Sequence, residues 1–200
     1  PIYLEMNYFG PHENSVVDFR LLDESPIFLI SGDTGAGKST IFDAMTYALF
    51  GTTTGDRDAK EMRSQFATAD DRTSVTFYFE QGNLLYRIER SPEQKLSKKR
   101  GSGSTLQKST AKLAIVDRVK GIEKNNIAIN PKNVGEEITR LLHLNAEQFK
   151  KIILLPQNDF SRFLKSSTPD KEAILKRIFG TYIFTSFSNE IKAKNSEMNA

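Results

Sequence analysis

Hydrophobic and polar residues alternate at the start of the chain, and this period of two predicts a β-strand over residues 2–8. The pair Gly10-Pro11 interrupts the alternation, and a second strand-like stretch follows over residues 15–19. Together the two stretches predict a hairpin. The continuous apolar run Ile27–Ile30 follows Pro26 and predicts a buried strand, of the kind found in parallel sheets.

The alternation returns in the middle of the chain. Residues 73–80 and 84–90 alternate on either side of a Gln-Gly-Asn turn, which predicts a second hairpin. Residues 91–110 are rich in Ser, Lys and Gly and predict a flexible basic loop or the tip of a hairpin. Residues 112–119 are again strand-like.

Helical spacing of apolar residues begins at Lys38 and ends at Gly51. The polar stretch 52–72 predicts a surface loop with a short helix at its end. Three more helices are expected, over 134–142, from Asn145 toward Leu155, and from Thr168 to Gly180; the tail from Phe184 is helical in propensity.

Composition narrows the possible chemistry. The 200 residues include no cysteine and two histidines, His12 and His143, which excludes disulfide scaffolds, cysteine nucleophiles and histidine-rich metal sites. No apolar run approaches the roughly 18 residues that a membrane span needs, and the first residues do not resemble a signal peptide. We therefore expect a cytoplasmic protein without a membrane partner.

Positive charge is concentrated in one segment. Residues 91–120 hold 8 Lys and Arg against 2 Asp and Glu, whereas residues 1–90 hold 8 against 14. A basic segment can contact nucleic-acid phosphates, although a solvated loop is the more common reason for such a composition.

One motif carries chemistry. Residues 32–39 read Gly-Asp-Thr-Gly-Ala-Gly-Lys-Ser, which satisfies the phosphate-loop pattern, and they lie between an apolar run and a helix. Glycines let the backbone amides approach an anion, and the helix start adds partial positive charge. Lys38 can reach the β- and γ-phosphates, and the Ser39 hydroxyl can bind Mg²⁺. The sequence therefore predicts an ATP and Mg²⁺ site with nucleotide-binding residues Gly32, Asp33, Thr34, Gly35, Ala36, Gly37, Lys38, Ser39 and Thr40.

Hydrolysis also needs a carboxylate behind the metal ion, normally at the end of an apolar strand. Asp117 ends such a stretch, but Arg118 follows it and the segment adjoins the basic loop, so we reject it. No Ser-Gly-Gly signature occurs. The sequence therefore predicts one half of an ATPase, with the phosphate loop but without the catalytic carboxylate and the signature motif.

Several segments together resemble SbcC, the family of SMC-like ATPase subunits of bacterial SbcCD nucleases. They are the phosphate loop, Asn7–Pro11, Phe42–Gly51, Met62–Ala67, the hairpin over 75–90, Leu144–Phe149 and Ile153–Leu164. The resemblance implies an α/β fold, the N-terminal half of an ABC-ATPase-like head over residues 1–182, with an antiparallel β lobe. Residues 183–200 would begin a coiled-coil arm.

The resemblance also implies roles and partners. Gln157 would be the Q-loop glutamine. It would be a catalytic residue together with Lys38 and a metal ligand together with Ser39. The family usually has Gly and Glu after this glutamine, where this chain has Asn158 and Asp159. Lys60, Met62 or Arg63 would contact the adenine. The implied partners are the C-terminal half of the same head, a second head in an ATP-dependent homodimer, an SbcD-like nuclease subunit and DNA.

Other functions stay open from the residues alone. Another ABC-type ATPase, such as a different SMC-like repair protein or a transporter's nucleotide-binding subunit, would share the phosphate loop. A small-molecule kinase usually has this loop after its first strand, whereas two strands are expected before it here. A non-catalytic basic binding module would leave the loop unexplained.

Overall fold

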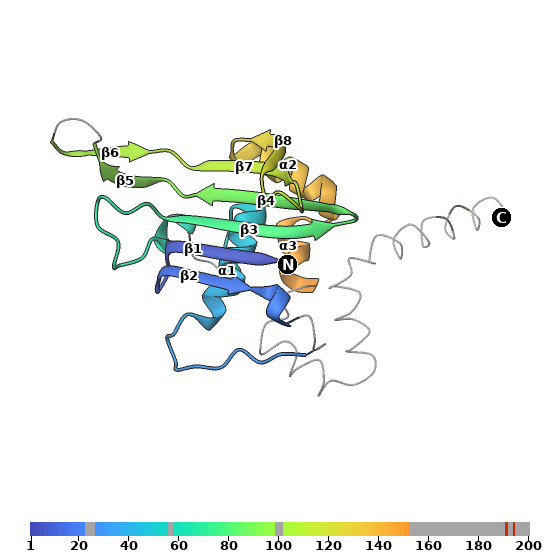
Figure 1. Ribbon diagram of the computed structural model, residues 1–200, viewed down its shortest axis with the longest axis horizontal. Helices are drawn as coiled ribbons and strands as arrows, with labels where there is room; N and C mark the ends of the chain where they lie inside the picture. The colour runs from blue at the N-terminus through green and yellow to red at the C-terminus, as the bar shows by residue number, and fades with distance from the viewer. Residues whose placement is uncertain (23–26, 56–57, 99–101, 153–190, 192–193, 195–200) are drawn as a thin grey trace. The chain divides into compact units, whose positions relative to one another are not determined.

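The computed structural model describes residues 1–22, 27–55, 58–98, 102–152, 191 and 194 (Figure 1). The chain divides into two compact units, residues 1–145 and residues 146–200. Gln157, the helix expected to start at Thr168 and most of the arm expected over 183–200 lie outside the described residues.

A six-stranded sheet forms the centre of the first unit, and every neighbouring pair in it is antiparallel. Its strands run in the order β2-β1-β3-β4-β7-β8. Their bounds are β1 Tyr3–Phe9, β2 His12–Asp18, β3 Ser74–Gln81, β4 Leu84–Ser91, β7 Thr110–Val116 and β8 Glu123–Ile129. Both predicted hairpins and the strand after the basic segment are confirmed. Strand β8 was not predicted, because its Glu-Lys-Asn-Asn start does not alternate.

The basic segment folds as a hairpin of its own. Strands β5 (Gln94–Ser97) and β6 (Ser104–Gln107) pair with each other as a separate two-stranded sheet. The Leu96 side chain is only 7% exposed, and the Ser97 amide donates to the Ala69 carbonyl at 2.7 Å. These contacts tie β5 to the segment before β3, and Figure 1 shows that β5 and β6 lie beyond the ends of β4 and β7.

Two helices cover one face of the large sheet. Helix α1 (Lys38–Phe50) contacts β1, β3 and β4, and helix α2 (Pro131–Leu142) contacts β7, β8 and α1. Both were predicted from their spacing. Short 3-10 turns follow β2 (η1, Phe19–Leu22) and precede β3 (η2, Ala59–Met62). The buried core beneath the helices includes Leu4, Met6, Ala44, Ala48, Val75, Phe77, Ile88, Leu113, Val134 and Ile138. In the second unit, α3 (Ala146–Ile152) forms part of the helix expected from Asn145.

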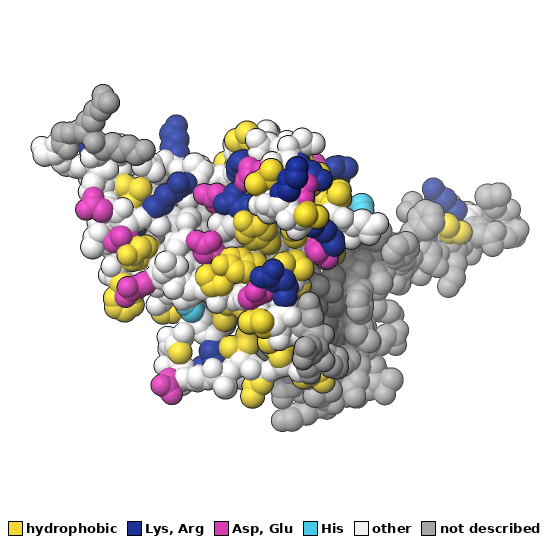
Figure 2. Space-filling view, in the orientation of Figure 1, with side chains coloured by type: hydrophobic (Ala, Val, Ile, Leu, Met, Phe, Trp, Pro, Cys, Tyr) yellow, Lys and Arg dark blue, Asp and Glu magenta, His cyan; other side chains and the backbone are white. Residues whose placement is uncertain are grey.

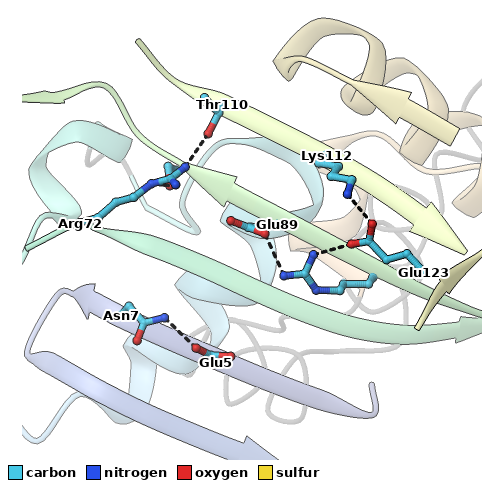
Figure 3. Close-up of polar contacts among 9 residues, drawn as sticks. Glu5, Asn7, Arg72, Glu89, Thr110, Lys112 and Glu123 are labelled. Atoms are coloured by element: carbon cyan, nitrogen blue, oxygen red, sulfur yellow. Dashed lines mark hydrogen bonds and ion pairs between the residues drawn. The ribbon is translucent and has the colours of Figure 1, made fainter. Parts of the chain in front are cut away.

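The opposite face of the sheet carries several ion pairs. The Arg87 guanidinium donates to Glu89 at 2.8 Å and to Glu123 at 2.8 Å, and Lys112 pairs with the same Glu123 carboxylate (Figure 3). On β1, the Asn7 amide donates to Glu5 at 2.8 Å. Figure 2 shows acidic and basic side chains intermixed with hydrophobic ones on this face. The alternation read from the sequence therefore separates an apolar face from a face of ion pairs.

The strand predicted over Ile27–Ile30 is the main correction. These residues have no regular secondary structure, and Ile27 and Leu29 are 83% and 88% exposed. A strand is stabilised by backbone pairing with a neighbour, and none of the described strands lies beside this segment in the sheet order. The side chains of Ile27, Phe28 and Leu29 are exposed in the described structure.

Candidate functional site

The predicted phosphate loop has the backbone conformation that its glycines suggest. Gly35 and Gly37 have φ angles of 88° and 86°, in the left-handed region that glycine adopts at little cost. Between them, the Ala36 amide donates to the Asp33 carbonyl at 3.2 Å. The spacing of the glycines thus has a direct backbone cause.

Helix α1 begins immediately after this loop, and its first turn is open. Gly37 is the N-cap residue, and no side chain caps the helix. The first turn also contains no acidic residue. An uncapped helix start presents amide N–H groups and partial positive charge, which together favour an anion. The geometry therefore suits a phosphate group.

The Lys38 side chain folds back over the same loop. Its Nζ donates to the Gly32 carbonyl at 2.8 Å and to the Asp33 carbonyl at 2.7 Å. Both acceptors are neutral, so these bonds position the ammonium without neutralising its charge. A lysine held in this way can act as a point charge toward a phosphate.

Ser39 and Thr40 have different environments. Ser39 is exposed, so its hydroxyl is accessible to a ligand. Thr40 is only 7% exposed, and a Cβ added at Gly10 would lie 2.7 Å from its Cγ2 atom. Thr40 is therefore packed beneath the turn between β1 and β2. The remaining predicted residues Asp33, Thr34 and Ala36 are exposed on the loop.

The turn between β1 and β2 and the start of β2 pack against the phosphate loop at Gly37. His12 Nε2 lies 3.1 Å from the Gly37 carbonyl oxygen, and Nδ1 lies 3.0 Å from the Ser15 hydroxyl. A Cβ at Gly37 would meet His12 Nε2 at 2.5 Å and Pro11 Cγ at 2.7 Å. Sequence reasoning considered His12 only as a metal ligand. Its place at the turn of the first predicted hairpin was the only available signal.

The residues suggested as adenine contacts are engaged in other contacts. Met62 is 2% exposed, and Lys60 pairs with Glu93 at 2.7 Å. The Arg63 guanidinium donates to the Gln94 side chain at 2.7 Å, to the Thr73 hydroxyl at 3.0 Å and to the Thr68 carbonyl at 2.6 Å. These bonds give Arg63 a structural role, because they join the segment before β3 to β5.

Asp117 organises a turn. Its carboxylate accepts from the Val119 amide at 2.8 Å and the Lys120 amide at 3.0 Å, and it pairs with Lys124 at 3.0 Å. The Lys120 amide, then Lys124 and the Val119 amide, lower the pKa of Asp117 to about 2. This is the chemistry of a hairpin anchor between β7 and β8, which agrees with rejecting Asp117 as the catalytic acid.

Two features are absent from the part of the chain that the structure describes. In that part, no group of three or more His, Cys, Asp or Glu residues is arranged to hold a metal ion. No helix there has the length and apolar character required to cross a membrane.

Comparisons with known proteins support the interpretation of the loop. The model of a family described as "AAA domain" matches residues 3–200. The chain is 38% identical over 203 residues to the SbcC component of the nuclease SbcCD from Staphylococcus aureus strain MRSA252, covering 100% of this chain and 19% of that protein. It is 37% identical over 187 residues to the Vibrio cholerae protein of the same name, covering 92% and 18%.

The chain spans about a fifth of the length of the curated relatives it matches. The resemblance to SbcC is confirmed by these identities over nearly the whole chain. The P-loop class predicted from residues 32–39 agrees with the family match and with the geometry of the loop. The chain therefore belongs to the AAA domain family of P-loop NTPases.

Proposed function

We propose that this chain is the nucleotide-binding part of an ATPase subunit in an SbcCD-type nuclease complex that processes DNA double-strand breaks or hairpins. The observation that carries the proposal is the loop itself. The Lys38 side chain is hydrogen-bonded to the loop, in which Gly35 and Gly37 have left-handed φ angles. The same loop leads into a helix start that no side chain caps. The names of the relatives supply the type of complex.

ATP would bind along residues 32–40, with amides of the loop and Lys38 contacting its phosphates. A magnesium ion would neutralise phosphate charge and orient the γ-phosphate. The donor set fits this ion, because the Ser39 hydroxyl is an exposed hard oxygen ligand beside Lys38. Gln157, outside the described residues, is proposed as the second ligand and as the residue that orients the attacking water.

The exposed segment Ile27–Ile30 supports an ABC-ATPase-like head completed from elsewhere in the protein. Two of its side chains, Ile27 and Leu29, are more than four-fifths exposed directly before the phosphate loop. Burying them would be favourable, at about 25 cal/mol per Å² of apolar surface. We propose that strands from the C-terminal half of the same head pair with this segment, and that this half also supplies the catalytic acid and signature motif.

The larger assembly follows from the same proposal. Residues 1–182 would form the N-terminal half of the head, and residues 183–200 would begin its coiled-coil arm. Two heads would close on ATP as a homodimer and control access of DNA to an SbcD-like nuclease subunit, in the cytoplasm. The β5–β6 hairpin is a candidate for phosphate contacts, because Lys95 and Lys98 on it and Lys108 directly after it are exposed.

The direct test is nucleotide binding by the full-length protein with the substitution Lys38→Ala. Removing a charge-assisted contact should weaken the affinity for Mg·ATP by at least about tenfold. Lys132→Ala is the matched control, since this exposed lysine lies on α2. Ser39→Ala should mainly weaken the magnesium dependence. Equal ATP affinity for the Lys38 variant and the wild type would contradict the proposal.

Measurements of ATP turnover distinguish residues that bind nucleotide from residues that act in hydrolysis. The described part of the chain contains no assigned catalytic acid, so the chain alone should bind nucleotide and hydrolyse it very slowly. Adding the C-terminal half should restore hydrolysis. Gln157→Ala should then reduce kcat more than affinity, because a water-orienting group acts chiefly in the transition state.

A different ABC-type ATPase is the alternative function. It would share the loop but would not act with a nuclease partner, and the turnover of a transporter subunit would also not respond to DNA ends. Copurification of the full-length protein with a metal-dependent nuclease, and ATP-dependent cleavage by that complex, distinguish the two.

A further inference from the structure

The contact between His12 and Gly37 joins two parts of the chain that lie 25 residues apart. His12 begins β2, in the hairpin that packs against the phosphate loop. Its ring is held at both nitrogens, at 3.1 Å from the Gly37 carbonyl oxygen and 3.0 Å from the Ser15 hydroxyl. A ring held at both ends has a defined orientation.

The chemistry of the two partners assigns the ring proton. A carbonyl oxygen can only accept a hydrogen bond, so Nε2 must carry the proton that it donates to Gly37. In the neutral ring, Nδ1 then accepts from the Ser15 hydroxyl. The Gly37 carbonyl therefore selects the tautomer, and Ser15, whose hydroxyl can donate or accept, holds the ring in that orientation.

This contact controls the direction of the Lys38 amide, which belongs to the same peptide unit as the Gly37 carbonyl. The peptide between Gly37 and Lys38 is planar and trans, so its carbonyl and its N–H point in opposite directions. The same carbonyl accepts from the Thr40 amide at 3.0 Å. With the carbonyl held by His12 and Thr40, the Lys38 N–H faces away from the hairpin.

Close packing at Gly37 accompanies the hydrogen bond from His12. A Cβ at Gly37 would lie 2.5 Å from His12 Nε2 and 2.7 Å from Pro11 Cγ, so only glycine fits at this position. At Gly35, by contrast, an added Cβ would have no neighbour within 4 Å. The hairpin therefore approaches the loop closely at the residue that precedes Lys38.

We propose that His12 is a positioning residue for nucleotide binding: its Nε2–H holds the Gly37 carbonyl toward the hairpin, so that the Lys38 amide is directed at the bound phosphate. His12 itself does not touch the nucleotide. This proposal rests on the proposed nucleotide-binding function. It adds the β1–β2 hairpin to the parts of the chain that determine ATP affinity.

The test compares two amide substitutions in the full-length protein. The side-chain nitrogen of glutamine reaches about as far as His Nε2, whereas that of asparagine reaches about as far as Nδ1. His12→Gln should therefore retain Mg·ATP affinity, while His12→Asn and His12→Ala should weaken it about three- to tenfold, as expected for one lost hydrogen bond. Affinity is measured by calorimetry with a non-hydrolysable ATP analogue and Mg²⁺.

A structural role would give a different result. If His12 only stabilised the hairpin, the variants would lower the melting temperature of the nucleotide-free protein and leave the affinity of the folded fraction unchanged. That outcome, or equal affinity of the Gln and Asn variants, would overturn the proposal. Should His12→Ala not fold, the Gln and Asn pair decides alone. Wild-type protein that binds no ATP would instead refute the proposed function.

Discussion

Arg90 donates from Nε to the carbonyl oxygen of Ala48 at 2.9 Å, although Arg90 is only 3% exposed. Its Nη2 also donates to the Leu49 carbonyl at 3.1 Å. These carbonyls belong to the last turn of α1, where intrahelical donors run out and the helix carries partial negative charge. An arginine on the inner face of β4 thus caps the helix that begins at the phosphate loop.

Replacing Arg90 with methionine should destabilise the protein by about 3 kcal/mol, because two buried carbonyls lose charged donors. Burial lowers the pKa of Arg90 to about 10, so the side chain remains charged at neutral pH and the loss should not vary between pH 6 and 8. Urea unfolding measures the change. Arg87→Met, on the polar face of the sheet, is the control and should cost less; equal losses would show that burial of the cap does not matter.

Substitution of the loop glycines should separate backbone strain from steric contact. Gly35→Ala meets only the cost of a positive φ, whereas Gly37→Ala also drives a Cβ into His12 and Pro11. Gly37→Ala should therefore lower the melting temperature more than Gly35→Ala, beyond the roughly 1 kcal/mol that either residue pays for its φ angle. Thermal unfolding without nucleotide compares them, and the opposite ranking would contradict the packing of the hairpin against the loop.

Asp117 should stabilise the β7–β8 turn in a pH-dependent way. Its pKa is lowered to about 2 in the folded protein, from an ordinary value of 3.8, so its contribution is present above pH 3.8 and is lost as the pH falls toward 2. Asp117→Asn should be less stable at pH 7, and its stability should fall less steeply between pH 4 and 2. The variant should keep wild-type ATP turnover; a large loss of kcat would identify Asp117 as catalytic.

DNA binding offers a test of the basic hairpin. Replacing Lys95 and Lys108 with alanine should weaken DNA affinity and reduce the dependence of log K on log salt by about 0.9 for each phosphate contact removed. Both side chains are exposed beside β5 and β6. Binding titrations from low to moderate salt give the slope, with Lys132→Ala as the control. An unchanged slope would locate the DNA contacts elsewhere.

Local sequence patterns predicted most of the sheet and helix α1 correctly. The alternation in β1, β3 and β4 is strong because one face of each strand is buried and the other is polar. Strand β8 escaped detection because it lies at the edge of the sheet, where exposed asparagines replace the alternation. The apolar run Ile27–Ile30 was predicted as a strand but has no regular secondary structure here, since hydrophobicity favours burial but cannot supply a neighbouring strand.

The sequence by itself determined the P-loop class of the chain, since the spacing of the glycines, Lys38 and the start of the following helix lie within nine consecutive residues. Only the tertiary structure decided what supports that site. His12 reaches Gly37 across 25 residues, and Arg90 reaches Ala48 across 42. Both contacts depend on the register of strands and on which face packs against α1. Such long-range pairs leave no periodic signal in the chain, because hydrogen bonds to backbone carbonyls do not require a particular residue type at the acceptor.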